Sequence, residues 1–102
     1  MAITSALLYR GNLGTGTNTL YLATANTVVT NIAIANSNAT SVTATVNLST
    51  GGTSFALLSA VTIPANSTVF FDLKQYIANT QTITGGASTT GVTVHISGVT
   101  GV

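Results

Sequence analysis

The sequence predicts an all-β protein: an antiparallel β-sandwich, jelly-roll or immunoglobulin-like, of about seven or eight short strands. Three observations lead to this prediction. Charged helix formers are almost absent, since only 3 % of the 102 residues are charged. Threonine and valine, which favour the pleated surface of a sheet, dominate instead. Apolar and polar residues also alternate with period two between closely spaced turn signals.

The first two strands are expected on either side of a glycine-rich loop. The predicted strands are "TSALLY" (residues 4–9) and "NTLYLA" (residues 18–23), and "RGNLGTGTN" lies between them. Residues 11–16, "GNLGTG", resemble a phosphate-binding loop only superficially, because no lysine follows and no helix is predicted after them. We therefore interpret this segment as a flexible strand connector.

The clearest strand is "TVVTNIAIAN" (residues 27–36), and "SVTATVNL" (residues 41–48) follows the turn "NSNATS". Strand periodicity assigns the side chains of each to two faces. In the first strand one face holds Val28, Thr30, Ile32 and Ile34, and the other holds Thr27, Val29, Asn31, Ala33 and Ala35. In the second, Val42, Ala44, Val46 and Leu48 point inward, and Thr43, Thr45 and Asn47 point outward. We predict that the two strands pair as a hairpin.

The second half of the chain contains four more predicted strands and one connecting segment. "SFALLSAVTI" (residues 54–63) is apolar and ends at Pro64, which suits the second position of a tight turn. "TVFFDLK" (residues 68–74) is a strand, and "KQYIAN" after it is a short helical turn or a connector. "QTIT" (residues 81–84) is a short strand.

The final strand is "VTVHISGV" (residues 92–99). Its inward face is predicted to hold Val92, Val94 and Ile96, with His95 opposite. In the strand of residues 68–74, one face holds Val69, Phe71 and Leu73, and the other holds Phe70, Asp72 and Lys74.

Composition bounds the class of protein. At this length we expect one β-sandwich domain spanning residues 1–102. The net charge of +1 and the two basic side chains give too weak a field for a nucleic-acid partner. No stretch approaches the roughly 20 apolar residues of a membrane span, so no membrane partner is expected. Cysteine is absent, which excludes disulfides and thiolate chemistry.

The chain has few side chains that could perform acid–base catalysis or bind a metal. Asp72 is the only carboxylate side chain and His95 the only histidine, so acid–base catalysis by two carboxylates is excluded. A metal site lacks ligands for the same reason. A triad of a serine, His95 and Asp72 is conceivable, but serine is so common here that the match carries little information. We expect no enzyme activity, no cofactor and no metal.

Low charge instead points to assembly. Exposed sheet edges normally carry charge, proline or bulges that prevent aggregation, and this chain has one proline and three charged side chains. We therefore expect other chains to cover the edges, in a symmetric homo-oligomer (a trimer is favoured) or on a larger assembly. Contacts without charge are insensitive to salt.

The candidate subunit interface consists of Phe70, Asp72 and Lys74 on one strand face, with Arg10 and His95 as further polar partners. The alternative is that Asp72 and Lys74, about 7 Å apart along the strand, form a solvated ion pair of little energetic value. The sequence leaves both interpretations open.

The later half of the chain resembles small virion proteins of tailed bacteriophages. Three segments carry the resemblance, over about residues 27–99: "VVTNIAIANSNATSVTATVNL", "IPANSTVFFDLKQYI" and "TITGGASTTGVTVHISGV". "DLKQ" and "HISGV" are the most specific elements. The resemblance implies a β-sandwich structural component of a phage particle, located in the virion and made in the host cytoplasm.

Such sandwiches serve as head decoration or cement proteins, as neck or head fibres, and as tail accessories. A decoration protein fits the uncharged single domain best, with the major capsid protein or tail and neck proteins as partners. A tail-linked adhesin that binds host glycan is the alternative.

Overall fold

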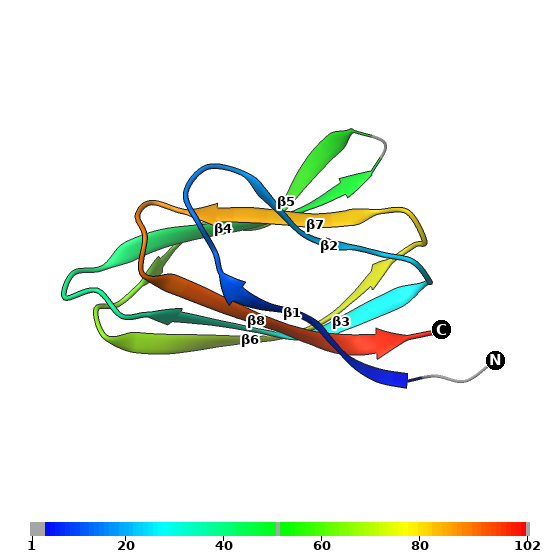
Figure 1. Cartoon of the computed structure of the whole chain (residues 1–102), viewed down its shortest axis with the longest axis horizontal. Helices are drawn as coiled ribbons and strands as arrows, with labels where there is room; N and C mark the ends of the chain where they lie inside the picture. The colour runs from blue at the N-terminus through cyan, green and yellow to red at the C-terminus, as the bar shows by residue number, and fades with distance from the viewer. Residues whose placement is uncertain (1–3, 51, 102) are drawn as a thin grey trace.

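Two four-stranded antiparallel sheets pack face to face in the computed structural model, which describes residues 4–50 and 52–101 (Figure 1). The first sheet has the order β1-β8-β3-β6 and the second the order β2-β7-β4-β5. The strands are β1 (Thr4–Asn12), β2 (Asn18–Leu22), β3 (Thr27–Asn36), β4 (Val42–Thr50), β5 (Thr53–Ile63), β6 (Ser67–Ile77), β7 (Thr82–Ala87) and β8 (Val92–Thr100). The described residues contain no helix, and the predicted β-sandwich is confirmed.

The strand order selects the jelly roll over the immunoglobulin-like alternative. Consecutive strands alternate between the two sheets, and only β4 and β5 are neighbours both in sequence and in a sheet. This wrapping of eight strands around one core is the jelly-roll arrangement. Named strand pairs are all antiparallel, and the bridge between Thr15 and Ala87 is parallel.

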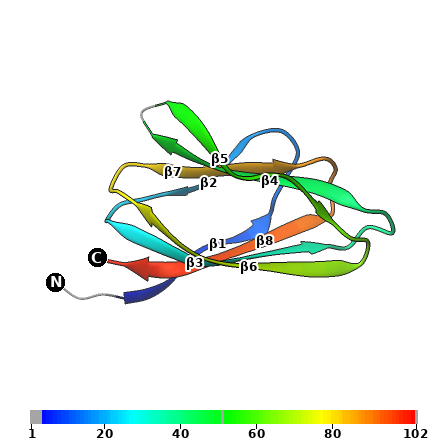
Figure 2. The same ribbon diagram turned by 180° about the vertical axis from the view of Figure 1, so that it is seen from behind.

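The predicted hairpin of residues 27–36 and 41–48 is wrong. β3 pairs with β6 and β8, whereas β4 pairs with β5 and β7 in the opposite sheet. The connection between β3 and β4 therefore crosses from one sheet to the other (Figure 2). Alternation shows that each strand has one buried face, but it does not say which strand lies beside it.

A buried asparagine holds this crossing in place. Asn36 is 2 % exposed, and its Nδ2 donates to the carbonyl oxygens of Thr40, Ile63 and Pro64 at 2.9, 3.2 and 3.1 Å. Its Oδ1 accepts from the backbone N–H of Asn38 at 2.9 Å. One side chain thus ties the β3–β4 connection to the turn that joins β5 to β6.

The core fills the space between the sheets. The inward faces predicted for residues 41–48 and 92–99 are confirmed. Leu48 packs against the core, and the other predicted residues are all buried: Val42, Ala44, Val46, Val92, Val94 and Ile96. Burying these aliphatic side chains removes apolar surface from water, which is the main favourable term in folding.

A β-bulge changes the faces predicted for β3. The register shifts between Val29 and Asn31 in both of its strand pairings. Before the bulge, Val29 is buried and Val28 faces out; after it, Ile32 and Ile34 are buried as predicted. Because one extra residue inverts the alternation, the prediction that Val28 and Thr30 share a face with Ile32 and Ile34 is wrong.

The predicted connector "KQYIAN" is also corrected. β6 continues through Lys74 and ends at Ile77, which is 1 % exposed. Exposed and partly buried residues alternate along the whole strand, so the faces predicted for Val69 to Lys74 are confirmed. The strand continues because Ile77 pairs with Thr27 of β3.

The glycine-rich loop between β1 and β2 is held by specific bonds rather than left free. Leu13 is fully buried, and Asn18 Nδ2 donates to the carbonyl oxygens of Leu13 and Thr15 at 3.2 and 3.1 Å. The backbone N–H of Ala87 donates to Gly14 at 2.8 Å. The loop therefore carries the chain from the first sheet to the second in one defined path.

Candidate functional site

All five residues of the predicted interface lie on the outer face of the first sheet. Phe70, Asp72 and Lys74 are exposed on β6, opposite the partly buried side chains of the same strand. Arg10 on β1 pairs with His95 on β8, His95 pairs with Ala33 on β3, and Ala33 pairs with Phe70. Directly paired residues point to the same side of a sheet, so these positions form one row across all four strands.

Arg10 and His95 are joined at one end of this row. The Nε of Arg10 donates to Nδ1 of His95 at 3.1 Å. A ring nitrogen accepts a hydrogen bond only when it carries no proton, so this contact belongs to the neutral imidazole with its proton on Nε2.

Asp72 lies in the neighbouring row, beside Asn31 of β3. Asn31 Nδ2 donates to its Oδ1 at 2.9 Å. The carboxylate is thereby oriented across the strands rather than along β6 toward Lys74. A side-chain hydrogen bond of this kind fixes the direction of a charge that would otherwise sample several rotamers.

Lys74 lies opposite the β3 bulge. Between the pairs Val29–Gln75 and Asn31–Asp72, β6 has two residues, Leu73 and Lys74, where β3 has only Thr30. Thr30, Asp72, Leu73 and Lys74 line an open hollow there. Two of the predicted interface residues, Asp72 and Lys74, therefore share this hollow beside the bulge.

Two apolar residues extend this face and were missed in the sequence. Leu7, Phe70 and Tyr76 are 53, 67 and 52 % exposed. Leu7 pairs with Ser97, in the row of Asp72, and Tyr76 pairs with Val28, so both point outward. Tyr76 follows the parity of Phe70 and Lys74, and extending the strand beyond Lys74 would have found it. Leu7 follows no such signal, because β1 has its own register shift between Leu7 and Tyr9.

The conceivable catalytic triad does not form. His95 and Asp72 lie on β8 and β6, which are separated by β3, so two strand spacings of about 4.8 Å lie between them. The Nδ1 atom of His95 contacts a guanidinium, where a triad needs a carboxylate. Residues 4–50 and 52–101 also contain no group of three or more potential metal ligands.

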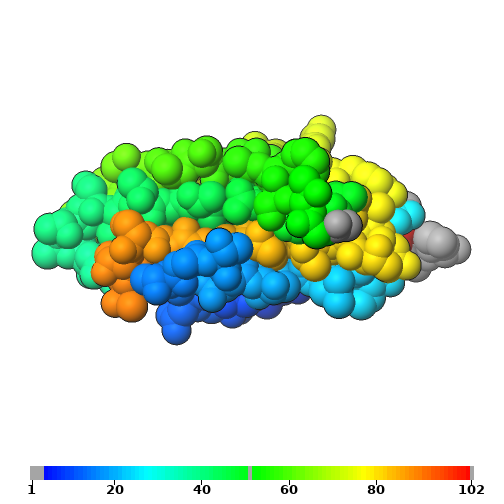
Figure 3. Space-filling model, turned by 90° about the horizontal axis from the view of Figure 1, so that it is seen from above, coloured from blue at the N-terminus to red at the C-terminus, as the bar shows by residue number. Residues whose placement is uncertain are grey.

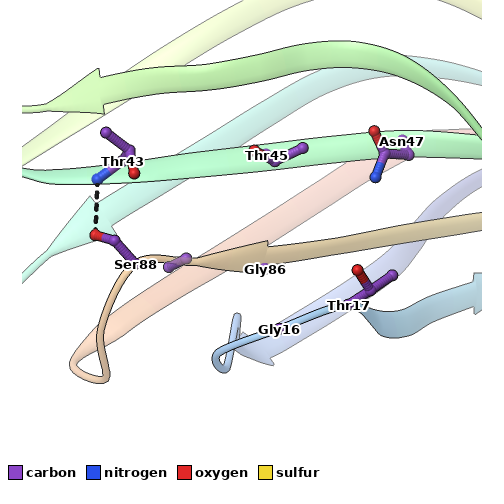
Figure 4. A pocket seen from close by; sticks show the side chains of 8 residues that line it. Gly16, Thr17, Thr43, Thr45, Asn47, Gly86 and Ser88 are labelled. Atoms are coloured by element: carbon purple, nitrogen blue, oxygen red, sulfur yellow. Dashed lines mark hydrogen bonds between the residues drawn. The ribbon is translucent and has the colours of Figure 1, made fainter.

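The outer face of the second sheet carries a different feature, a groove lined by hydroxyls and backbone. It lies between the loop before β2 and strand β4, with the end of β7 as its floor (Figure 3). Figure 4 shows Thr43, Thr45 and Asn47 in a line along β4. The groove encloses about 360 Å³, and no charged or aromatic residue lines it.

Much of this groove is already hydrogen-bonded within the protein. Ser88 Oγ accepts from the backbone N–H of Thr43 at 3.1 Å, and Thr45 Oγ1 accepts from that of Ala60 at 3.1 Å. Asn47 remains available at one end (Figure 4). The groove can therefore offer a ligand neutral hydrogen-bonding groups, but no nucleophile activated by a base.

No helix in the described part of the chain has the length and apolar character needed to cross a membrane.

Comparisons with known proteins agree on the fold. No protein-family model and no curated protein matches the chain. A chain of the T13 infectious bursal disease virus (IBDV) particle superimposes with a TM-score of 0.60 at 10 % identity, over 96 % of this chain and 30 % of that one. A chain of the Gx strain of the same virus gives 0.55 at 12 % identity, over 96 % and 31 %. This chain spans about a third of the length of those chains, and at such identities the likeness shows the jelly-roll fold.

Proposed function

We propose that this protein is a non-enzymatic structural component of a tailed bacteriophage virion, a decoration or cement protein that stabilises the head. The observation that carries the proposal is the jelly roll, which covers 96 % of the chain and which chains of the IBDV particle share. The resemblance of residues 27–99 to phage virion proteins supports a tailed bacteriophage as the kind of particle. The near absence of charge favours a protein whose surface is covered by other subunits in an assembly.

The contact surface in this proposal is the outer face of the first sheet. Arg10, Phe70, Asp72, Lys74 and His95 share it, and Leu7 and Tyr76 add exposed apolar area. Apolar side chains would supply the burial, and the oriented polar groups would set the register between subunits. The partners are copies of the same chain, as a trimer or another symmetric oligomer, and the major capsid protein or tail and neck proteins.

Quantitative mass spectrometry of purified virions tests the function. A decoration protein is present in hundreds of copies, whereas a neck or tail component is present in a handful. Absence of the protein from virions would contradict the structural role altogether.

Charge-removing variants test the contact surface. We expect Asp72→Asn and Lys74→Ala to lower incorporation into particles about tenfold while leaving the unfolding midpoint nearly unchanged, because both side chains are exposed. Asp72→Asn keeps an oxygen that can accept from Asn31. The control is Thr89→Ala, in the exposed loop before β8. If both variants are incorporated normally, Asp72 and Lys74 are solvated charges that contribute nothing to the subunit contact.

A second candidate is a tail-linked adhesin that contacts host glycan. The hydroxyl-lined groove on the second sheet favours it, since sugar hydroxyls bond to neutral donors and acceptors such as Asn47. Inhibition of phage adsorption by the purified protein, lost in Asn47→Ala, would support this role in place of decoration.

A further inference from the structure

The side of the sandwich formed by β5 and β6 leaves part of the core incompletely covered. β5 pairs only with β4, and β6 only with β3, so both are edge strands. Figure 2 looks onto this side. Ten partly buried hydrophobic residues pack against the core, and six belong to these two strands: Leu57, Leu58, Val61, Val69, Phe71 and Leu73. Partial exposure of the core is thus concentrated here, on what we call the β5–β6 side.

The charged residues protect the other long edges but not β5. Arg10 lies on β1, and Asp72 and Lys74 lie on β6, the two edge strands of the first sheet. Charged side chains on an edge discourage pairing with another chain. In the second sheet, β2 has only five residues, and a short edge is a poor template. β5 has eleven residues and no charge.

We propose that the β5–β6 side binds a second copy of this chain around a twofold axis, with the two β5 strands running antiparallel. In such a contact residue i of one strand meets residue j of its copy and j meets i. A charge near the axis would therefore face a like charge, and β5 carries none. A net charge of +1 gives little repulsion between approaching copies. An uncharged, exposed edge meets identical chains whenever the protein is concentrated.

The size of this side fits a dimer contact. The molecule measures 45 × 26 × 18 Å, and Figures 1 and 2 look along the shortest axis. The β5–β6 side therefore spans the two longer dimensions, which is room for the roughly 800 Å² that each partner buries in a standard interface. Phe55, 60 % exposed near the start of β5, adds apolar area to bury.

Bulges limit the hydrogen-bonded part of the contact. The pairing of β5 with β4 shifts at Leu57 and again at Ser59 and Ala60, where Ala60 has a φ of 47°. Bulges twist an edge away from regular pairing. The contact therefore combines a short antiparallel stretch with the apolar side chains of the β5–β6 side, and we expect affinity in the micromolar range.

Sedimentation of the purified chain tests the dimer. We expect the mass to rise from 10.2 kDa toward twice that value between about 1 and 500 μM. Ala56→Lys puts a charge on the exposed edge and should weaken the dimer at least about tenfold. Thr89→Lys adds the same charge in an exposed loop and should dimerise like the unmodified chain. Circular dichroism checks that both variants fold.

A cysteine scan gives the register. The chain has no cysteine, so single substitutions at residues 54–58 report only on contact between copies. Under oxidation we expect one position, the one nearest the twofold axis, to form a disulfide-linked dimer efficiently, since the Cα atoms must lie about 4.4–6.8 Å apart. Thr89→Cys should form no disulfide-linked dimer.

Three results would overturn the proposal. The unmodified chain could stay monomeric up to 500 μM, Ala56→Lys could dimerise as well as Thr89→Lys, or Ala56→Lys could lose binding to virions while the unmodified chain never self-associates. The last result would assign this side to a different protein. None of these measurements depends on the proposed virion role, which concerns the outer face of the first sheet and fails or holds separately.

Discussion

At the scale of single residues, the glycine of "HISGV" has a steric explanation. Gly98 lies on β8 beside the β3 bulge, paired with Val29. A Cβ there would collide with the carbonyl oxygen of Val28 and crowd a methyl of Leu8. The bulge brings the β3 backbone too close for any side chain, so this element of the phage-like pattern reports on packing rather than chemistry.

Gly98→Ala should therefore destabilise the fold. We expect a loss of at least about 2 kcal/mol in the free energy of unfolding, because the obstructing atom belongs to the backbone. Urea denaturation measures it. Gly11→Ala is the matched control: the nearest atom to its Cβ is the Tyr9 hydroxyl at 3.1 Å, on a side chain that can move. Equal losses in the two variants would contradict the steric explanation.

The positions of the three charged side chains can also be explained at this scale. In the sequence, Asp72 and Lys74 beside Phe70 allow either a subunit contact or a solvated ion pair. In the structure they and Arg10 occupy the edge strands of one sheet, where charge disfavours unwanted strand pairing. Protection of the edges and a role in subunit contact are compatible, because both act through the same exposed side chains.

At the scale of elements, Asn36 connects two turns that are distant in sequence. It anchors the β3–β4 crossing and the β5–β6 turn through five hydrogen bonds, two of them to Asn38. Both turns lie at one end of the sandwich (Figure 1). Each carries the chain from one sheet to the other, so this side chain helps to hold the sheets together.

Asn36→Ala should lower the free energy of unfolding by about 2–4 kcal/mol, because it leaves the buried carbonyl of Ile63 and several partly buried backbone groups without partners. The change in urea midpoint gives the value. Asn79→Ala, at an exposed position, should change stability by less than about 0.5 kcal/mol. A small effect at Asn36 would mean that the turns are held by backbone bonds alone.

At the scale of the whole molecule, assembly should respond weakly to salt. The β5 strands that pair in the proposed dimer carry no charge, and the Debye length falls from about 14 Å to about 4 Å between 0.05 and 0.5 M NaCl. We expect the dimer dissociation constant to change less than about threefold over this range, as measured by sedimentation. A change of tenfold or more would indicate that charged groups such as Lys74 or Arg10 make the contact.

The fold class and most strand faces could be predicted from the sequence. Period-two alternation located the strands and their buried sides, as at Val92, Val94 and Ile96, because each strand has one face in the core. It failed where a bulge inverts the alternation, as at Val28 and Thr30. It failed also for the supposed hairpin, since pairing between strands is a property of the chain path.

For the candidate site, too, the sequence determined some features and the tertiary structure decided the others. The sequence alone determined a β-sandwich with only three charged side chains, and it singled out Arg10, Phe70, Asp72, Lys74 and His95. That these five share one face, and that β5 is the long edge without charge, was decided only by the tertiary structure. The physical reason is that alternation is a local property of each strand, whereas strand order depends on contacts between residues far apart in the chain.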